Sequence, residues 1–534
     1  MSRVAEAVPY RTPFTLWIGF AAMCLGMFMA ILDIQIVVTS LPVIQDALGI
    51  GADRMSWVQT AYLIAEVIAI PLTGLLTRVF TLRWLFVGAI AAFTLASIGC
   101  ALSIGFGTLI AWRIVQGLAG GVLIPLVFSA IFLLFDRGFP QTVATTMGGV
   151  LAVLPPALGP ISGGLLTENF SWHWLFLINV IPGILCFLVG MLCLPREKRQ
   201  LNLLASLDWL SLLLIALGLA ALQIGLKEAP DRGWSSGRVL GFFLILAICG
   251  SLAVRRPRPA VDFTLLRDRN LAFGCAISFI LGLCLFGSVY LMPVFLAFVR
   301  EHGPVAIGVI ILVTGIAQLI AAPIAILLDR RFDARLLSAI GFAGFALGLA
   351  MSAHQTVATD YDEMFWPQII RGSFVALCIL PPTRFALGFV PLTRVSDASG
   401  LYNLCRNLGG AIGIALIDTV MFTQGPIQAE RLTELIRTNP PEAAKLLGLA
   451  IDDLPGPEDA MGLISIMDSI QYASLTLAIN QAWMMLAIIA AASLLLLWIM
   501  GPIRGTIPDR NATSAGTRAG TQPAQEPVNT LLTK

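Results

Sequence analysis

The chain has 534 residues, of which 57% are hydrophobic and only 12% are charged. A soluble protein of this length would carry about twice that share of charged residues, so the composition excludes an ordinary soluble domain. The formal net charge of +2 gives no sign of nucleic-acid binding, and we expect none.

Apolar runs as long as a bilayer requires recur from Phe14 almost to the C-terminus, and they predict an all-α polytopic membrane protein. The first run follows Arg3 and Arg11 and has no small-residue cleavage site, so we expect a membrane span there rather than a signal peptide. The sequence predicts fourteen transmembrane helices, at 14–41, 56–77, 83–103, 107–135, 141–166, 173–194, 208–226, 239–254, 271–299, 305–328, 336–353, 363–383, 398–421 and 481–501.

Lysine and arginine residues are distributed unevenly between the two sides of these spans. If the N-terminus is cytoplasmic, the loops on its side hold most of the basic residues, including the cluster from Arg255 to Arg269. The long outer loop 422–480 instead holds more acidic than basic residues. This positive-inside asymmetry predicts that both termini are cytoplasmic.

The span count predicts five segments along the chain. They are a cytoplasmic N-terminus (1–13), an N-terminal six-helix half (14–194), a linker with two extra transmembrane helices (195–270), a C-terminal six-helix half (271–501) that includes the outer loop, and a disordered cytoplasmic tail (502–534). Helix-compatible stretches occur in the outer loop. We interpret this loop either as a solvated cap over the outer mouth or as a docking surface for a partner.

Two carboxylates lie inside the first two predicted spans, where a charge costs on the order of a few kcal/mol. Asp33 lies in the outer half of the first span, at a depth similar to that of Arg113 in the fourth. A protonatable group whose partner changes with conformation suits proton coupling, and a static Asp–Arg bridge is the alternative. Glu66 lies near the middle of the second span and is a candidate for proton or cation binding, or for an interhelical hydrogen bond.

Arg113 begins a polar and glycine-lined face in the fourth predicted span. At about 100° per residue, Arg113, Gln116, Gly117 and Gly120 share one side of the helix. Such a stripe is typical of a cavity wall against which another helix packs closely. The alternative is a buried arginine that only holds helices together.

The fifth predicted span contains the stretch GGVLAVLPPALGPISGG (148–164), in which glycine and proline are unusually frequent. Prolines that lack an amide donor bias a helix toward a bend. Gly159 and Gly163 form a small-xxx-small pair, which favours close packing against another span. We therefore expect a kinked helix that packs across the interface between the halves, with a merely tolerated kink as the alternative.

The second half repeats part of the first. PQIIRGSFVALCILPP (367–382) resembles RIVQGLAGGVLIPL (113–126) when Arg371-Gly372 is aligned with Gln116-Gly117. Two parallel six-helix halves place a substrate site at their interface. We therefore expect a substrate cavity, formed by Gln116, Gly117, Gly120, Arg371, Asn403 and Arg406.

The last predicted spans carry two further charges. Arg406 lies in the inner half of its span beside Asn403 and Asn407, where a structural role is the alternative to substrate binding. Asp418 lies nearer the outer end and is interpreted as an interfacial anchor.

Several stretches of the sequence resemble the fourteen-span drug:proton antiporters of the major facilitator superfamily, of the EmrB/QacA type. The strongest are LDIQIVVTSLPVIQDALG (32–49), SWVQTAYLIAEVIAIPLTG (56–74), WRIVQGLAGGVLIPL (112–126), GPISGG (159–164), WHWLFLINVIPG (172–183) and LYNLCRNLGGAIG (401–413). The resemblance implies the major facilitator fold and a link between proton coupling and Asp33 and Arg113. To these two residues we add Glu66, from its place in the second span, as a candidate for proton coupling. It also implies that Gly159, Pro160, Gly163 and Gly164 belong to the antiporter signature.

The sequence departs from this family at two places. The family's loop between the second and third spans usually contains an Asp in a charge relay that locks a gate, but GLLTRVFTLR (74–83) keeps Gly74, Arg78 and Arg83 without that Asp. A gate relay of the usual form is therefore not expected. In the antiporter signature, earlier glycines are replaced by Thr146 and Pro155.

The sequence and the resemblance together predict a proton-driven multidrug efflux antiporter of the bacterial inner membrane that exports lipophilic and cationic compounds. Its expected partners are a small-molecule substrate, protons and membrane lipids. For a long outer loop of this kind, the resemblance also implies a periplasmic adaptor and an outer-membrane channel. Alternatives are a narrow-specificity exporter of a metabolite, fatty acid or siderophore, and a membrane enzyme or scaffold.

Neither an enzymatic activity nor a cofactor is expected. The nine cysteines lie within predicted spans or at their ends, and the three histidines lie far apart. We therefore expect no disulfide framework and no metal site, and the proton gradient is the expected energy source.

Overall fold

The computed structural model describes residues 13–49, 57–136, 138–197, 200, 202, 208–256, 261–329, 331–456 and 460–500. The predicted tail 502–534 and most of the predicted N-terminus 1–13 lie outside these residues. In the described residues all regular elements are helical, which confirms the all-α class. The α-helices are α1 (Phe14–Thr39), α2 (Leu41–Leu48), α4 (Trp57–Ala101), α5 (Phe106–Leu134), α6 (Phe139–Val153), α7 (Pro155–Asn169), α8 (Trp174–Leu177), α9 (Val180–Cys193), α10 (Trp209–Arg232), α11 (Gly237–Val254), α12 (Arg269–Phe298), α13 (Pro304–Asp329), α14 (Ala334–Met351), α15 (Tyr361–Leu387), α16 (Val395–Thr438), α17 (Pro440–Leu447), α18 (Ala460–Ser465) and α19 (Met467–Met500).

Twelve helices in these residues are long and apolar enough to cross a membrane, judged by length and composition. One of them, α4, has 45 residues, which corresponds to about 68 Å at 1.5 Å per residue and exceeds twice the ~30 Å hydrocarbon core. Its backbone is non-helical at Thr81 (φ 70°, ψ 161°), between the second and third predicted spans. The predicted fifth span is divided between α6 and α7. If α4 is counted as two spans and α6 with α7 as one more, the twelve helices correspond to fourteen spans. The count of fourteen stays a prediction.

The glycine- and proline-rich stretch is interrupted at Leu154, between α6 and α7. Because Pro155 and the residue after it have no N–H to donate, the helical hydrogen-bond ladder cannot continue through them. A Cβ at Gly159 would overlap Gln35 of α1, so this glycine allows α7 to approach a helix of its own half. On the other side, Gly308 of α13 lies directly against Ile161 of α7.

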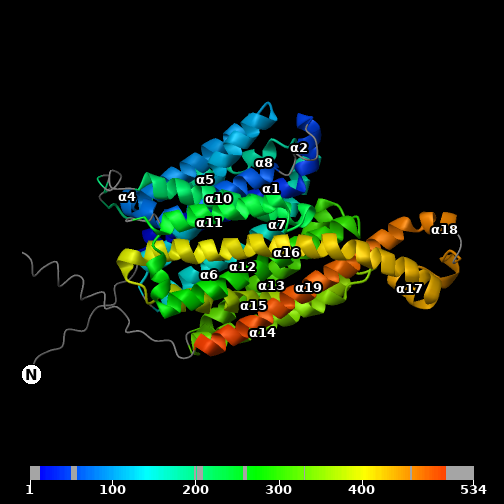
Figure 1. Cartoon of the computed structure of the whole chain (residues 1–534). Helices are drawn as coiled ribbons and strands as arrows, with labels where there is room; N and C mark the ends of the chain where they lie inside the picture. The colour runs from blue at the N-terminus through cyan, green and yellow to red at the C-terminus, as the bar shows by residue number, and fades with distance from the viewer. Residues whose placement is uncertain are drawn as a thin grey trace, which may run out of the picture.

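The long helices run roughly side by side as one elongated bundle (Figure 1). In the N-terminal part α4 packs against α5 and α9, and α1 packs against α7. In the C-terminal part α12 packs against α16, and α15 packs against α13 and α14. The two parts meet where α16 contacts α4 and α5, and where α13 contacts α6 and α7.

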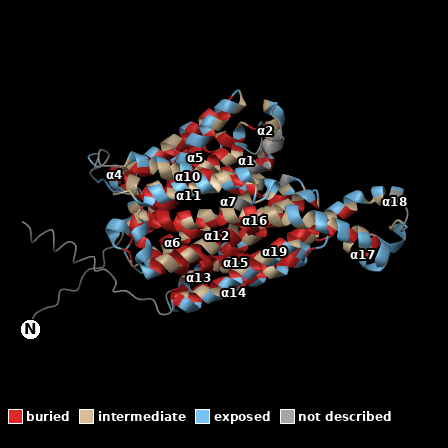
Figure 2. Ribbon diagram, viewed as in Figure 1, coloured by how far each residue is buried: buried red, intermediate tan, exposed pale blue. Residues whose placement is uncertain are grey.

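Helices α10 and α11 pair with each other, and α10 lies against α16 and α4. Trp234, between them, donates a hydrogen bond from Nε1 to Thr419 Oγ1 at 2.9 Å. At the other end of α10, Asp208 caps the helix and pairs with Arg256 at 2.6 Å. The hydrogen bond from Arg256 holds the pKa of Asp208 below its ordinary value. Many outward-facing leucines of α10 and α11 are exposed, as expected for a lipid-facing surface (Figure 2).

The segment predicted as the long outer loop forms a helical lobe that projects from one end of the bundle (Figure 1). It consists of the end of α16, α17, α18 and the start of α19. Leu432, Ile436, Leu447 and Ile470 form its own small hydrophobic core. The lobe is therefore a folded unit, built on two helices that continue out of the bundle.

Candidate functional site

The carboxylate of Asp33 lies at the centre of a fully buried polar cluster in the N-terminal part. Arg113 Nη1 donates to Asp33 Oδ2 at 2.5 Å, and both side chains have 0% exposed surface. Gln116 Nε2 and Asn179 Nδ2 donate to Asp33 Oδ1 at 2.9 and 2.8 Å. Three donors from two different helical segments therefore surround one carboxylate of α1.

Helix geometry brings these groups together. Arg113 and Gln116 are three residues apart on α5, so both side chains point from one face of the helix toward α1. Gln116 Oε1 accepts from Arg113 Nη1 at 2.9 Å, and its Nε2 also donates to Ser97 Oγ of α4 at 2.9 Å. Gln116 thus fixes the orientation of both the acid and the base.

The other side of Arg113 is held by α4 and by aromatic rings. Its Nε donates to the carbonyl of Val58 at 3.0 Å, and its guanidinium lies 4.4 Å from the ring centre of Tyr62 and 5.9 Å from that of Phe176. Tyr62 in turn donates to the carbonyl of Ala30 at 3.0 Å. Nη2 of Arg113 has no hydrogen-bond partner among the described residues.

Glu66 lies one turn from Tyr62 on α4 and is 3% exposed. Gly121 of α5 packs directly on the Glu66 backbone, which brings this carboxyl group into the neighbourhood of Arg113. Within the described residues, no hydrogen bond or ion pair to the Glu66 carboxyl group is found. The structure therefore places a second buried acid near Arg113 but outside the Asp33 network.

The glycines of the Arg113 face allow α5 to approach α4. A Cβ at Gly117 would overlap the Tyr62 carbonyl oxygen, and one at Gly120 would overlap the Tyr62 hydroxyl. These two residues, predicted to line a cavity, are used here for close packing between α4 and α5.

Arg371 lies inside the C-terminal part, away from Arg113 and Asp33. Its neighbours are Met292 of α12, Thr314 of α13 and Trp483 of α19. Nη2 approaches Met292 Sδ at 3.3 Å and Thr314 Oγ1 at 3.4 Å, whereas Nη1 has no partner among the described residues.

Arg406 and Asn403 lie on α16, where it packs against α5 of the other part. The Arg406 guanidinium is 5.2 Å from the ring centres of both Phe128 and Tyr402. Its Nε and Nη2, and Oδ1 of Asn403, are buried without hydrogen-bond partners in the described residues. One turn before Asn403, Ser399 bridges the two parts by donating to the carbonyl of Pro125 at 2.9 Å.

Asp418 lies farther along α16 and accepts a hydrogen bond from the hydroxyl of Tyr290 of α12 at 2.8 Å. This contact lies within the C-terminal part. It does not join the Asp33 network.

The loop between the second and third predicted spans forms an ion pair that the sequence did not reveal. Arg78 of α4 lies 3.2 Å from Asp397 in the first turn of α16, and Gly74 packs directly against Asp397. An acid from the C-terminal part therefore faces the loop in which the family's Asp is missing. Arg83 takes no part, because its guanidinium donates to the carbonyl of Met191 at the end of α9.

Sequence reasoning missed Ser97, Asn179 and Asp397. Asn179 had a readable signal, since it is the single amide in the apolar run LFLINVIPG. Ser97 and Asp397 had none, because a serine in a span and an acid in a loop are common. The described residues contain no group of three or more His, Cys, Asp or Glu that could hold a metal ion.

Comparisons with known proteins agree with this architecture. The family model of the Major Facilitator Superfamily matches residues 23–414. The chain is 36% identical over 501 residues to the colistin resistance protein EmrB of Acinetobacter baumannii, covering 92% of this chain and 97% of that protein. It is 30% identical over 495 residues to the multidrug export protein EmrB of Escherichia coli strain K12, covering 90% and 94%.

A solved structure shares the fold at low sequence identity. The human organic anion transporter MFSD10 (TETRAN) superposes with a TM-score of 0.56 at 12% identity, covering 90% of this chain and 100% of that chain.

Breaking the Asp33–Arg113 pair is expected to destabilise the protein. Arg113→Gln leaves the Asp33 carboxylate buried without a cation, and breaking a buried pair in this way costs about 3–5 kcal/mol. We expect a lower melting temperature for the purified protein, and recovery of most of the loss in Asp33→Asn/Arg113→Gln, which removes both charges. Arg238→Gln, at an arginine that is 57% exposed, serves as the control. Equal melting temperatures for the single and double variants would contradict the pairing.

Proposed function

Because this chain belongs to the major facilitator superfamily, in its EmrB/QacA-type branch, we propose that it is a proton-driven multidrug efflux antiporter. It exports lipophilic and cationic compounds by alternating access between the N-terminal half (14–194) and the C-terminal half (271–501). The observation that carries this proposal is the buried Asp33 carboxylate, which is held by Arg113, Gln116 and Asn179. Its multi-pass helical architecture and family are those of a transporter rather than an enzyme.

Asp33 is the proposed proton carrier. When Asp33 is ionised, the Arg113 guanidinium compensates its charge at 2.5 Å. A proton on Asp33 removes that compensation and frees Arg113 to turn toward another acceptor. Glu66 is the nearby buried acid without a hydrogen bond in the described residues, so it is the proposed second partner. Proton binding and substrate binding then favour opposite-facing states, as an exchange cycle requires.

The substrate cavity is proposed to lie where the two halves meet, between α5 and α16. The aromatic rings of Phe128 and Tyr402 offer apolar surface there. Asn403 and Arg406 contribute polar atoms that are buried without partners in the described residues. Glu66 supplies negative charge for cationic substrates. No separate cofactor is needed in this scheme, because the proton gradient drives the cycle.

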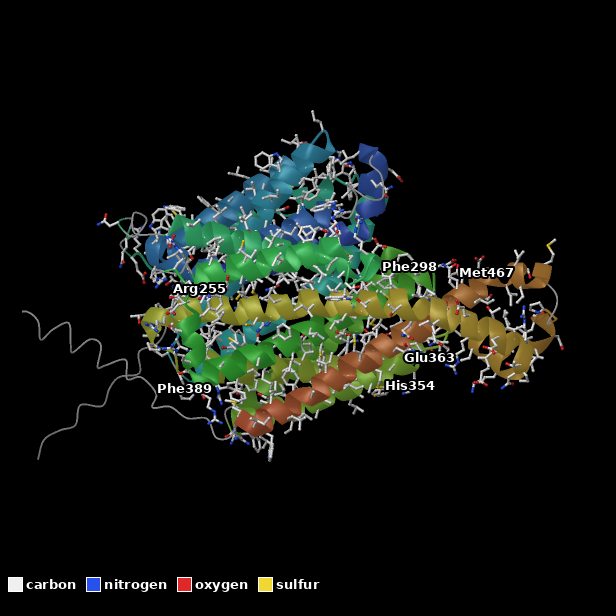
Figure 3. All side chains as sticks on the ribbon, in the orientation of Figure 1. Arg255, Phe298, His354, Glu363, Phe389 and Met467 are labelled. Carbon is white, nitrogen blue, oxygen red and sulfur yellow. The ribbon has the colours of Figure 1, made fainter. Side chains whose placement is uncertain are left out.

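The proposed location is the bacterial inner membrane, with both termini in the cytoplasm. Arg255, in a basic cluster, lies at one end of the bundle and Met467, at the base of the lobe, lies at the other (Figure 3). The positive-inside rule assigns the Arg255 end to the cytoplasm and the lobe to the periplasm.

The lobe is proposed to bind a periplasmic adaptor that connects to an outer-membrane channel. The lobe exposes large apolar side chains, since Ile451, Met461 and Ile464 are 56%, 79% and 65% exposed. A folded lobe with its own core does not need these residues for stability. Exposed apolar side chains on such a lobe suit a protein-binding surface.

A narrow-specificity exporter on the same fold is the alternative. The cluster around Asp33 fits either transporter, because it concerns the proton and not the substrate. The susceptibility profile of a pump-deficient host with and without the gene distinguishes them: protection against many unrelated compounds supports the multidrug proposal, and protection against one class supports the alternative.

Asp33→Asn tests the coupling directly. Asn retains the shape of Asp and can still hydrogen bond to Gln116 and Asn179, but it cannot carry the proton. In inverted vesicles we expect substrate addition to release protons with the unmodified protein and to release none with Asp33→Asn. Asp418→Asn, at an acid outside the Asp33 network, is the matched control and should still release protons. Undiminished release by Asp33→Asn would overturn the assignment.

The Arg78–Asp397 pair is proposed as a latch that holds the cytoplasmic side closed. Asp397→Asn should weaken closure by up to ~1 kcal/mol, since Arg78 is partly exposed, and so raise the inward-open population by up to about fivefold. The measurement is the rate at which an impermeant maleimide labels Ser399→Cys, a buried position at the interface. Asp333→Asn, at a helix cap within one half, is the control. Equal labelling rates with and without Asp397→Asn would exclude the latch.

Met461→Glu/Ile464→Glu tests the adaptor surface. Both side chains are exposed, so we expect unchanged melting temperature and unchanged transport in proteoliposomes. In cells, where export crosses two membranes, drug resistance should fall because the adaptor no longer docks. Thr438→Glu, at an exposed polar residue of the lobe, should leave resistance intact. Full resistance with the double variant would refute docking at Met461 and Ile464.

A further inference from the structure

The two halves contain buried polar clusters that are packed alike but differ in charge. Gly117 packs on the carbonyl of Tyr62 in α4, and Gly372 packs on the carbonyl of Thr314 in α13. Each glycine follows a buried polar residue, Gln116 in the first half and Arg371 in the second. The sequence repeat is therefore also a repeat in packing, which makes the two clusters comparable position by position.

The first-half cluster contains its own anion and the second-half cluster does not. Gln116 and Arg113 both reach the carboxylate of Asp33 on α1. Arg371 instead meets Met292 on α12, where the thioether sulfur at 3.3 Å is a weak acceptor without charge. In the described part of the chain, no acid forms an ion pair with Arg371.

Arg371 keeps its positive charge in this environment, because arginine is not deprotonated in proteins. It is 4% exposed, and its Nη1 has no hydrogen-bond partner among the described residues. The ring of Trp483, centred 5.2 Å away, supplies only a cation–π contact. A buried charge without a counter-charge is strongly unfavourable, so this guanidinium favours binding of an anion.

A small cavity lies directly beside this guanidinium. Its volume is about 30 Å³, and its polar lining consists of Arg371, Ser288 and Thr314 among apolar side chains. This exceeds the roughly 10–15 Å³ that a water-sized group needs. The unpartnered Nη1 of Arg371 is a donor suited to a single small anion. The Ser288 hydroxyl donates here to the Leu285 carbonyl at 2.8 Å and the Thr314 hydroxyl to Gln368 Oε1 at 2.9 Å, and each can turn toward an anion in the cavity.

A second cavity lies next to the first, at the outer end of the bundle. It has a volume of about 320 Å³, shares Met292 with the first cavity and is bounded by Trp483. Its mouth includes the exposed His354 and Glu363, which lie at the end of the bundle nearest the lobe (Figure 3). The Glu363 carboxylate is occupied there by a hydrogen bond from the backbone N–H of Asp360 at 3.0 Å.

Basic groups stand beside this mouth. Arg300 and His302 lie 3.0 and 3.1 Å from Asp360, the residue that caps α15. Partial burial raises the pKa of Asp360. Hydrogen bonds from Arg300 and His302 lower it, and the net effect holds this pKa below its ordinary value. The acid at the mouth is thus neutralised by its own partners.

We propose that Arg371, Ser288 and Thr314 form a binding site for a small monovalent anion, either a halide or the carboxylate of a small organic acid, reached through the outer cavity. The bound anion takes the place that the Asp33 carboxylate has in the first half. This inference is independent of the proposed export activity, because it concerns binding within the C-terminal half.

The test measures thermal unfolding of the full chain in a non-ionic detergent. Sodium gluconate, whose anion is too large for the inner cavity, is replaced stepwise by sodium chloride or sodium formate at constant ionic strength. We expect the melting temperature to rise saturably, by about 2–5 °C, with at least one of the two small anions. A response to chloride alone identifies a halide site, and a response to formate alone identifies a carboxylate site.

Two variants establish where the anion binds. Arg371→Gln should remove the response, whereas Arg238→Gln, at an exposed arginine, should retain it. Met292→Asp places a carboxylate beside Arg371, as Asp33 is placed in the first half, so this variant should be stable in gluconate and show no further rise. It decides the question even if Arg371→Gln does not fold. The absence of any saturable response in the unmodified protein, or the same response in Met292→Asp, would overturn the proposal.

Discussion

A charge buried between membrane helices needs a partner of opposite charge, and this requirement organises the N-terminal half of the protein. Asp33 and Arg113 are both 0% exposed, and each is the other's counter-charge. Gln116 and Asn179 then donate to the second oxygen of the Asp33 carboxylate, and Ser97 accepts a hydrogen bond from Gln116. The close packing at Gly117 and Gly120 follows from the same need, because only glycine lets α5 approach α4 closely enough for Arg113 to reach the Val58 carbonyl.

The same requirement links structure to transport. If the partner of Arg113 is set by the protonation of Asp33, a proton changes the electrostatics of one half without changing its packing. The contacts between the halves are different in kind. They include a hydroxyl on a carbonyl at Ser399, a partly exposed ion pair at Arg78, glycine contacts at Gly74 and Gly308, and the Arg406 guanidinium over the Phe128 ring. These contacts can separate without breaking a fully buried ion pair, as alternating access requires.

Much of this could be predicted from the sequence, for identifiable physical reasons. Long apolar runs predicted the helical membrane class, and the cost of a charge in lipid singled out Asp33 and Arg113 as partners before their contact was seen. Asn179 stands out as the single amide of its apolar run, but its hydrogen-bond partner, like that of Ser97, depends on how the helices meet in space and could not be predicted. Asp397 was missed because its partner, Arg78, lies some 300 residues away in the other half. The absence of an acid from the loop does not indicate which distant acid pairs with Arg78 instead. Arg371 was expected near the substrate, yet its neighbours all belong to the C-terminal half.

We propose above that Asp33 exchanges its proton when substrate binds. Substrate-induced infrared difference spectroscopy of the reconstituted protein measures this exchange, because a protonated carboxyl group has its own C=O band, separate from that of a carboxylate. We expect substrate to reduce the protonated-carboxyl band in the unmodified protein, and we expect this difference to disappear in Asp33→Asn. The same difference band in both proteins would contradict proton exchange at Asp33.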